Sequence, residues 1–123
     1  MRILVLDDVE LRHNVFDNIY QGHEVVHAYV YHSFVDKLKY DGPWDLIHLD
    51  HDLGDFPEVP DYYLDGWGKK QEYNGVHAAM RVCEMDNPPK VIIHSVNPVG
   101  SKSMLQMLER RGVEVTWEPF RDQ

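Results

Sequence analysis

The chain has very little cysteine: Cys83 is the single one among 123 residues. One thiol cannot form an internal disulfide, and this favours a reducing compartment. Cys83 falls within a helical stretch, where a packed thiol is the expected role. Long apolar runs are also absent, since none approaches the roughly 20 residues that span a bilayer, and no signal-peptide pattern precedes the first strand. We therefore expect a cytoplasmic protein with no membrane partner.

Positive charge is scarce as well. The chain carries 12 Lys and Arg against 21 Asp and Glu, which gives a formal net charge of −9. Broad binding to nucleic acid is not expected, because phosphate neutralisation needs clustered Lys and Arg. Carboxylates that gather at one place repel each other and usually need a cation or raised pKa values. Part of the negative charge is therefore a candidate metal site.

The chain does have enough apolar material for one core. A hydrophobic share of 43%, without repeat, linker or low-complexity segment, predicts one domain over residues 1–123. Short apolar runs predict strands at residues 2–6, 24–28, 45–50, 90–94 and 113–117. Helical patterns separate them at residues 9–20, 33–40, 74–85 and 101–111, with Ser33 and Ser101 as candidate caps. This alternation predicts an α/β fold: a flavodoxin-like, doubly wound, five-stranded parallel sheet of order 2-1-3-4-5 with helices on both faces.

Residues 53–73 show no regular pattern. An irregular segment of that length is uncommon inside a compact domain, and it indicates a functional loop or a wrong assignment. The segment carries aromatic side chains: Phe56, Tyr62, Tyr63, Trp67 and Tyr73. They could stack a nucleobase beside a phosphate site, or they could pin the loop to the domain, which is the interpretation we favour.

Three expected strands end in polar clusters. ILVL is followed by Asp7-Asp8, LIHL is followed by Asp50-His51-Asp52, and VIIH ends in His94. In open α/β sheets, ligands bind beyond the carboxyl ends of the strands, where the direction of winding reverses. The order 2-1-3-4-5 puts that reversal between the first and third strands. The pattern therefore predicts an active site at this edge.

Carboxylates in these clusters predict a cation site. Asp7 and Asp8, aimed at Asp50, form a plausible oxygen-ligand set for Mg²⁺, and Mn²⁺ would also fit. Asp52 is a further candidate ligand. The alternative for the first pair is structural, since one of its carboxylates could cap the next helix.

Histidines in the second and third clusters predict acid–base chemistry. His51 and His94 could divide the labour at one phosphate, one as general base and the other as general acid. Such a pair suits the opening of a cyclic phosphate, although the order of the two roles stays open. His51 could instead be a loop histidine satisfied by a neighbouring Asp. His48 lies within the strand and is expected to be a hydrogen-bonded core residue.

Phosphate contacts are expected from three further residues. Arg12 could reach a phosphate bidentately, or it could be an exposed helix charge. Ser95 follows His94 at the strand end and is a second candidate. Asn97 could orient a water or donate to an oxyanion, or it could serve turn chemistry before Pro98.

The segments ILVLDD, LIHLD and VIIHS resemble a response-regulator receiver domain. A closer resemblance is to the cyclic-phosphate processing receiver domains, through LDHDLG together with HSxNPxG, and it covers nearly the whole chain. The resemblance implies a receiver-like fold, with Asp7, Asp8 and Asp50 at the positions that hold Mg²⁺ and with Asp50 at the position that is phosphorylated in ordinary receivers. Those receivers also carry a Lys at the end of the last strand. This chain has Trp117 there, followed by Glu118-Pro119, and this departure argues against a phosphoacceptor.

These observations together predict a metal-dependent phosphoesterase acting on a cyclic phosphate of a nucleotide or of an RNA end. The expected catalytic residues are His51, His94 and Asp50. Two alternatives remain: a receiver-type signalling module phosphorylated on Asp50, and a protein that binds a cyclic nucleotide without turnover. The oligomeric state stays open.

Overall fold

The computed structural model describes residues 1–53 and 62–121. At its centre lies a five-stranded parallel sheet of order β2-β1-β3-β6-β7. The strands are β1 (Arg2–Leu6), β2 (Glu24–Ala28), β3 (Leu46–Leu49), β6 (Lys90–Ile93) and β7 (Val115–Trp117). This is the predicted order 2-1-3-4-5, and the predicted α/β receiver-like fold is confirmed.

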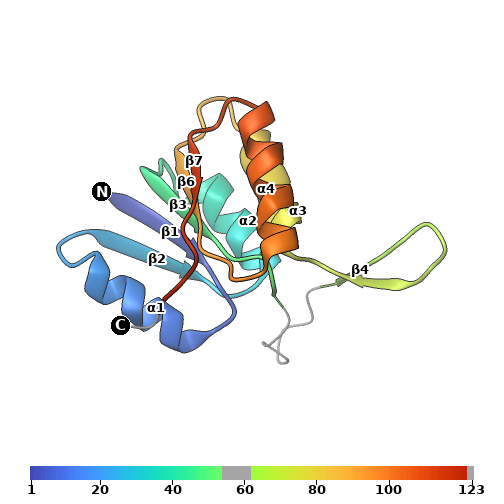
Figure 1. Cartoon of the computed structure of the whole chain (residues 1–123), viewed down its shortest axis with the longest axis horizontal. Coiled ribbons are helices and arrows are strands. Elements are labelled where there is room, and N and C mark those ends of the chain that lie inside the picture. The colour runs from blue at the N-terminus through green and yellow to red at the C-terminus, as the bar shows by residue number, and fades with distance from the viewer. Residues whose placement is uncertain (54–61, 122–123) are drawn as a thin grey trace.

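Helices cover both faces of this sheet, as predicted (Figure 1). They are α1 (Glu10–Ile19), α2 (Tyr31–Tyr40), α3 (Gly75–Cys83) and α4 (Pro98–Arg110). The last three pack side by side on one face, whereas α1 lies on the other. Within the described part of the chain, no helix is long and apolar enough to cross a membrane.

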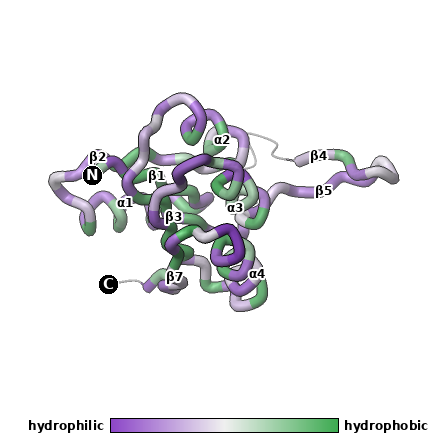
Figure 2. Tube along the Cα trace, turned by 90° about the horizontal axis from the view of Figure 1, so that it is seen from above, coloured by the Kyte–Doolittle hydropathy of each residue, from purple (hydrophilic) through white to green (hydrophobic). Residues whose placement is uncertain are grey.

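Side chains along β1 alternate between the two faces of the sheet, so the strand contributes to a hydrophobic cluster on each face. Leu4 and Leu6 point into the large core beneath α2, α3 and α4. Ile3 and Val5 point the other way and pack with Phe16 of α1 in a smaller cluster. Successive strand residues face opposite sides of a sheet, so a strand buried on both faces reads as an unbroken apolar run. Figure 2 shows these hydrophobic stretches gathered in the strands between the helical layers.

Two helices begin a few residues before the serines that are predicted to cap them. Helix α2 starts at Tyr31, and its N-cap Val30 makes no side-chain capping bond, so Ser33 lies inside the helix. Helix α4 starts at Pro98, and the Oδ1 atom of Asn97 caps it by accepting from the Gly100 N–H at 3.0 Å. Asn is a strong N-cap and Pro is pre-organised for the first helical position, which explains the earlier start.

The segment expected to be irregular contains a hairpin in its described part. Strands β4 (Tyr62–Leu64) and β5 (Lys70–Glu72) pair antiparallel and project from the domain (Figure 1). At the base of the hairpin, Tyr73 stacks on Tyr31 with ring centroids 4.0 Å apart. This contact supports the interpretation that the aromatic residues pin the loop to the domain. Phe56 lies outside the described residues.

Candidate active site

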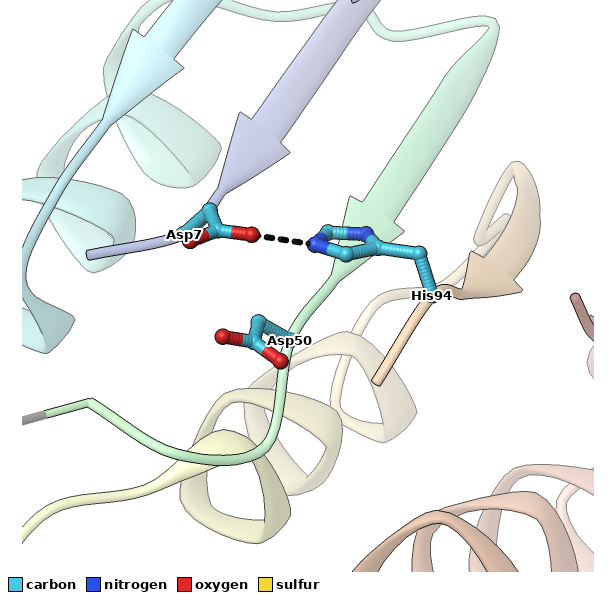
Figure 3. A group of neighbouring side chains, drawn as sticks. All are labelled: Asp7, Asp50 and His94. Atoms are coloured by element: carbon cyan, nitrogen blue, oxygen red, sulfur yellow. Dashed lines mark hydrogen bonds and ion pairs between the residues drawn. The ribbon is translucent and has the colours of Figure 1, made fainter. Parts of the chain in front are cut away.

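Three strand ends bring together the side chains of Asp7, Asp50 and His94 (Figure 3). Each offers one potential ligand atom, and these atoms all lie within 4.8 Å of one another. The residues are only 0%, 3% and 2% exposed, respectively. The sequence-based prediction of convergence at this edge of the sheet holds for these residues.

Backbone hydrogen bonds set the register of this cluster. The ladder of the parallel sheet continues one residue beyond each strand: the Asp50 N–H donates to the Leu6 carbonyl at 3.0 Å, and the His94 N–H donates to the Leu49 carbonyl at 3.0 Å. Because the three side chains sit at equivalent positions, they leave the sheet on the α1 face together.

Asp7 and His94 form a buried hydrogen-bonded pair. The Nε2 atom of His94 lies 2.7 Å from Asp7 Oδ2. Burial raises the pKa of Asp7, but the hydrogen bond from His94, together with the Val9 N–H and the charge of Arg12, outweighs it and leaves the pKa below its usual value. Burial lowers the pKa of His94. We therefore assign an ionised Asp7 that accepts the Nε2–H of a neutral imidazole.

The pKa of Asp50 is shifted in the opposite direction from that of Asp7. Burial, followed by the negative charge of Asp7, raises its pKa to about 7. Arg12 opposes this rise: its Nη1 atom lies 3.4 Å from Asp7 Oδ2 and 3.5 Å from Asp50 Oδ2. Arg12 therefore faces the carboxylates and is not an exposed helix charge.

This acidic cluster could bind a divalent cation such as Mg²⁺. Carboxylate oxygens are the ligands that hard cations prefer. The raised pKa of Asp50 also fits a cation site, because positive charge there would relieve the repulsion between Asp7 and Asp50. Asp8 is buried but lies outside this group of three residues.

His51 belongs to a second, more open group. Its Nδ1 atom lies 2.8 Å from Asp52 Oδ1, and the Nδ2 atom of Asn97 lies 3.4 Å from each of these two atoms. With the Asp52 carboxylate as acceptor, the proton sits on Nδ1 and Nε2 keeps a lone pair. His51 and Asp52 line a cavity of about 310 Å³ together with Asp8, Leu53, Glu72, Tyr73 and Asn74. Asp52 is mostly exposed and contacts His51 and Asn97, and the buried cluster of three residues does not include it.

Residues 2–110 match the family described as "Cyclic-phosphate processing Receiver domain". The chain belongs to this family. The match confirms the resemblance in LDHDLG and HSxNPxG, and it gives a cyclic-phosphate processing context to the buried cluster of Asp7, Asp50 and His94, which resembles the acidic pocket of receivers. No curated protein matches the chain significantly.

Solved structures of receiver domains share the fold of this family member. The N-terminal domain of a response regulator/sensory box/GGDEF protein from Carboxydothermus hydrogenoformans is 19% identical, with a TM-score of 0.66, over 97% of this chain and 80% of that one. A response regulator from Burkholderia pseudomallei, with a phosphorylated aspartic acid and a calcium ion, is 14% identical, with a TM-score of 0.66, over 98% and 61%. TrrA from Thermotoga maritima, in complex with Mg²⁺ and BeF, is 17% identical, with a TM-score of 0.62, over 98% and 86%.

A tryptophan stands at the end of the last strand of this cyclic-phosphate processing receiver domain. Trp117 ends β7, and its Nε1–H donates to the Ser95 carbonyl at 2.8 Å. Ser95 is fully buried, and its Oγ atom accepts the Asn97 N–H at 3.0 Å. Ser95 and Trp117 therefore shape the turn before α4. Among the described residues, the cation that contacts Asp50 is Arg12 from α1.

Two glycines of this domain fit the site closely, although sequence analysis assigns neither a role. A Cβ atom on Gly100 would lie 2.3 Å from the His51 ring, and one on Gly75 would lie 2.0 Å from the Asp50 carbonyl oxygen. The Gly75 N–H also donates to the His51 carbonyl at 2.8 Å. Two sequence signals could have indicated them: Gly100 is the last residue of HSxNPxG, and Gly75 directly follows the helix cap Asn74.

Proposed function

We propose that this protein is a divalent-cation-dependent phosphoesterase that hydrolyses a cyclic phosphate of a nucleotide or of an RNA end. The observation that carries the proposal is the buried cluster of Asp7, Asp50 and His94 with Arg12 against both carboxylates, in a chain of the cyclic-phosphate processing family. Exposed carboxylates are common without a function. Burying two carboxylates beside the Arg12 guanidinium costs free energy, and such groups are typical of functional sites.

The acidic residues would hold the cation. Asp7 and Asp50 offer oxygen ligands, and Asp8 could ligate directly or through water from its place at the neighbouring cavity. When bound, a divalent cation would supply positive charge that neutralises the phosphate oxygens. Arg12 would contact the phosphate from the other side, since its guanidinium already lies against the same carboxylates.

The histidines would have different tasks. Nε2 of His51 has the lone pair that can accept the proton of the attacking water, because the Nδ1 proton is donated to Asp52. The water oxygen then bonds to phosphorus, one ester P–O bond breaks, and the ribose oxygen that leaves takes up the proton that His51 accepted. His94 would hold Asp7 ionised and oriented through its Nε2–H. Asn97 would orient the Asp52 carboxylate, to which its Nδ2–H can donate.

A turnover assay tests this proposal. Purified protein is incubated with 2′,3′-cyclic and 3′,5′-cyclic mononucleotides, cyclic dinucleotides and RNA ending in a 2′,3′-cyclic phosphate, with Mg²⁺, Mn²⁺ or a chelator. We expect metal-dependent turnover of at least one substrate class, and its loss in Asp50→Asn. The matched control is Asp36→Asn, an exposed acid on α2. Turnover that is equal in Asp50→Asn would contradict the proposal.

A receiver-type signalling function is the second candidate. The fold shared with a response regulator that carries a phosphorylated aspartic acid supports it, whereas Trp117 in place of a Lys argues against it. Incubation with acetyl phosphate followed by intact mass measurement separates the two. A stable adduct in the wild type that is lost in Asp50→Asn, without turnover of any cyclic phosphate, would favour signalling.

A further inference from the structure

A cavity of about 520 Å³ lies on the α1 side of the sheet, and it differs from the cavity that holds His51. Its volume falls within the range of small-molecule sites, about 300–1,000 Å³. The sheet, α1 with its C-cap and the segment after β7 contribute the residues that matter here: Phe16, Ile19, Tyr20, His48, His94 and Phe120. The catalytic proposal uses only one of them, His94.

The sheet forms the floor of this cavity, and two histidines that line it each have a ring nitrogen without a partner among the described residues. The Nδ1 atoms of His48 and His94 are buried and accept or donate no hydrogen bond within the described part of the chain. The two residues are 4% and 2% exposed. A buried polar group left unpaired costs about 1–3 kcal/mol, so a ligand that pairs with it gains affinity.

The hydrogen bonds of the Nε2 atoms of His94 and His48 determine how the two rings can interact with a ligand. Nε2 of His94 donates its proton to Asp7, so Nδ1 of a neutral ring presents a lone pair. Nε2 of His48 lies 2.6 Å from the Tyr20 hydroxyl, and this bond orients the second ring. A ligand on this floor therefore needs an N–H or O–H donor for His94.

The walls favour a flat ring. Phe16 lies 4.6 Å from His48, 4.9 Å from His94 and 5.7 Å from Phe120, measured between ring centroids. Phe16 is buried by these contacts, and the half-buried rings of Tyr20 and Phe120 are the ones that can stack on a planar ring. Such a contact adds about 0.5–1.5 kcal/mol beyond the buried area. Aromatic walls with a hydrogen-bond acceptor at the floor suit a heteroaromatic ring that carries N–H groups.

Arg12 connects this cavity to the acidic cluster. Its guanidinium carbon lies 5.2 Å from the centroid of the Phe120 ring, and its Nη1 atom contacts both Asp7 and Asp50. A nucleotide whose phosphate lies at Arg12 would therefore have its ribose next to Arg12, and its heteroaromatic base would lie beyond the ribose, on the side of Phe120.

We propose that this cavity binds a nucleobase, with its ring against Tyr20 and Phe120 and an N–H group on the floor. The base could belong to the substrate, and this version rests on the proposed function. It could also belong to a separate nucleoside or nucleotide, and that version does not depend on catalysis.

An NMR titration with nucleosides tests whether the cavity binds a base, whichever molecule carries that base. Long-range ¹H–¹⁵N spectra of the full chain report each imidazole nitrogen while adenosine, guanosine, cytidine or uridine is added. We expect at least one nucleoside to shift the Nδ1 signals of His94 and His48 saturably, while the nitrogens of His51 stay in place. Signals that do not move with any of the four up to its solubility limit would overturn the proposal.

Two tryptophan substitutions on α1 provide a matched pair. Ile19 lines the cavity and is 53% exposed, whereas Leu11 is 73% exposed and does not line it. Ile19→Trp should fill the cavity and weaken nucleoside binding at least about tenfold, which corresponds to about 1.4 kcal/mol. Leu11→Trp should leave the affinity unchanged. Equal affinity in both variants would contradict the assignment of the cavity.

Competition then identifies the source of the base. If a cyclic nucleotide that the protein hydrolyses competes with the nucleoside, the cavity binds the base of the substrate. If the two bind simultaneously, the cavity binds the base of a separate ligand. Nucleoside binding without any turnover sinks the proposed function and leaves this inference intact. Self-association that Ile19→Trp abolishes, with no nucleoside effect, would instead assign the cavity to a second copy of the chain and overturn the inference.

Discussion

The Nε2 atom of His94 lies 2.7 Å from the Oδ2 atom of Asp7, and both side chains are buried between the sheet and α1. Burial raises the pKa of Asp7, but this bond, together with the Val9 N–H and the charge of Arg12, brings the pKa below its usual value and favours the ionised carboxylate. The negative charge of that carboxylate raises the pKa of Asp50 across the cluster. The hydrogen bond from His94 therefore helps to lower the pKa of Asp7, and the charge that it favours there adds to the effect of burial in raising the pKa of Asp50.

The first prediction concerns this coupling. Replacing Asp7 by Asn removes the charge that disfavours ionisation of Asp50, so the pKa of Asp50 should fall from about 7. It should stay above the ordinary 3.8, because burial remains the largest cause of the shift. Carboxyl ¹³C chemical shifts followed over pH measure this directly. The same substitution at the exposed Asp36 should leave Asp50 unchanged, and an unchanged Asp50 in Asp7→Asn would refute the coupling.

The second prediction links Asp50 to stability. A carboxyl group whose pKa is raised on folding holds its proton more tightly in the folded state, so it makes folding less favourable as the pH rises from about 4 to about 7. A shift of about three units corresponds to at most about 4 kcal/mol. Urea unfolding without divalent cations should show the wild type losing stability relative to Asp50→Asn over this window.

Mg²⁺ provides the control for that experiment. A cation that binds the folded state stabilises it, and it should restore the wild type at pH 8 without affecting Asp50→Asn. Parallel stability curves for the two proteins across the whole pH range would show that Asp50 is ionised at its ordinary pKa.

The third prediction concerns His48. Burial, with a smaller effect of nearby His94, lowers the pKa of His48 from 6.5 to about 3. A histidine held neutral by the fold contributes stability above pH 6.5, and this stability is lost as the pH falls toward 3. By pH 4.5 the loss should reach about 2–3 kcal/mol. His48→Leu should flatten this part of the urea-unfolding curve, whereas the exposed His23→Leu should follow the wild type.

The fourth prediction concerns Gly100. A Cβ atom there would lie 2.3 Å from the ring of His51, so Gly100→Ala should move the imidazole away from Asp52. A displacement of about 1 Å at a catalytic group can lower the rate by about a hundredfold. We expect kcat to fall by one to two orders of magnitude, with little loss of helix stability, because Ala favours helices. Gly66→Ala, where a Cβ meets nothing within 4 Å, is the matched control. Equal kcat in the two variants would remove His51 from the mechanism.

Much of the fold follows from the sequence, because unbroken apolar runs such as Ile3 to Leu6 have few alternatives to a buried parallel strand. The convergence of Asp7, Asp50 and His94 also follows, since strand ends share one edge. The partner of His94 does not: whether its ring turns toward Asp7 or toward His51 depends on side-chain packing against Phe16, which no local pattern encodes.

The remaining differences have similar causes. The hairpin of β4 and β5 escapes prediction because its strands are three residues long and KQE has no apolar alternation. The cavity over His48 is invisible in the sequence because it arises where α1 and the segment after β7 leave the sheet uncovered. Close contacts at Gly75 and Gly100 likewise depend on the distance between elements far apart in the chain.

Hydrolysis of a 2′,3′-cyclic mononucleotide is the decisive experiment for the proposed phosphoesterase. A 2′,3′-cyclic mononucleotide is mixed with excess protein, and the conversion of the cyclic phosphate to a monoester is followed by ³¹P NMR for the wild type, Asp50→Asn and His51→Gln. We predict rapid conversion by the wild type with Mg²⁺ and at least about a hundredfold slower conversion with a chelator or in either variant. Conversion at the wild-type rate in both variants would contradict the account, as would its absence in the wild type for this and every other cyclic phosphate.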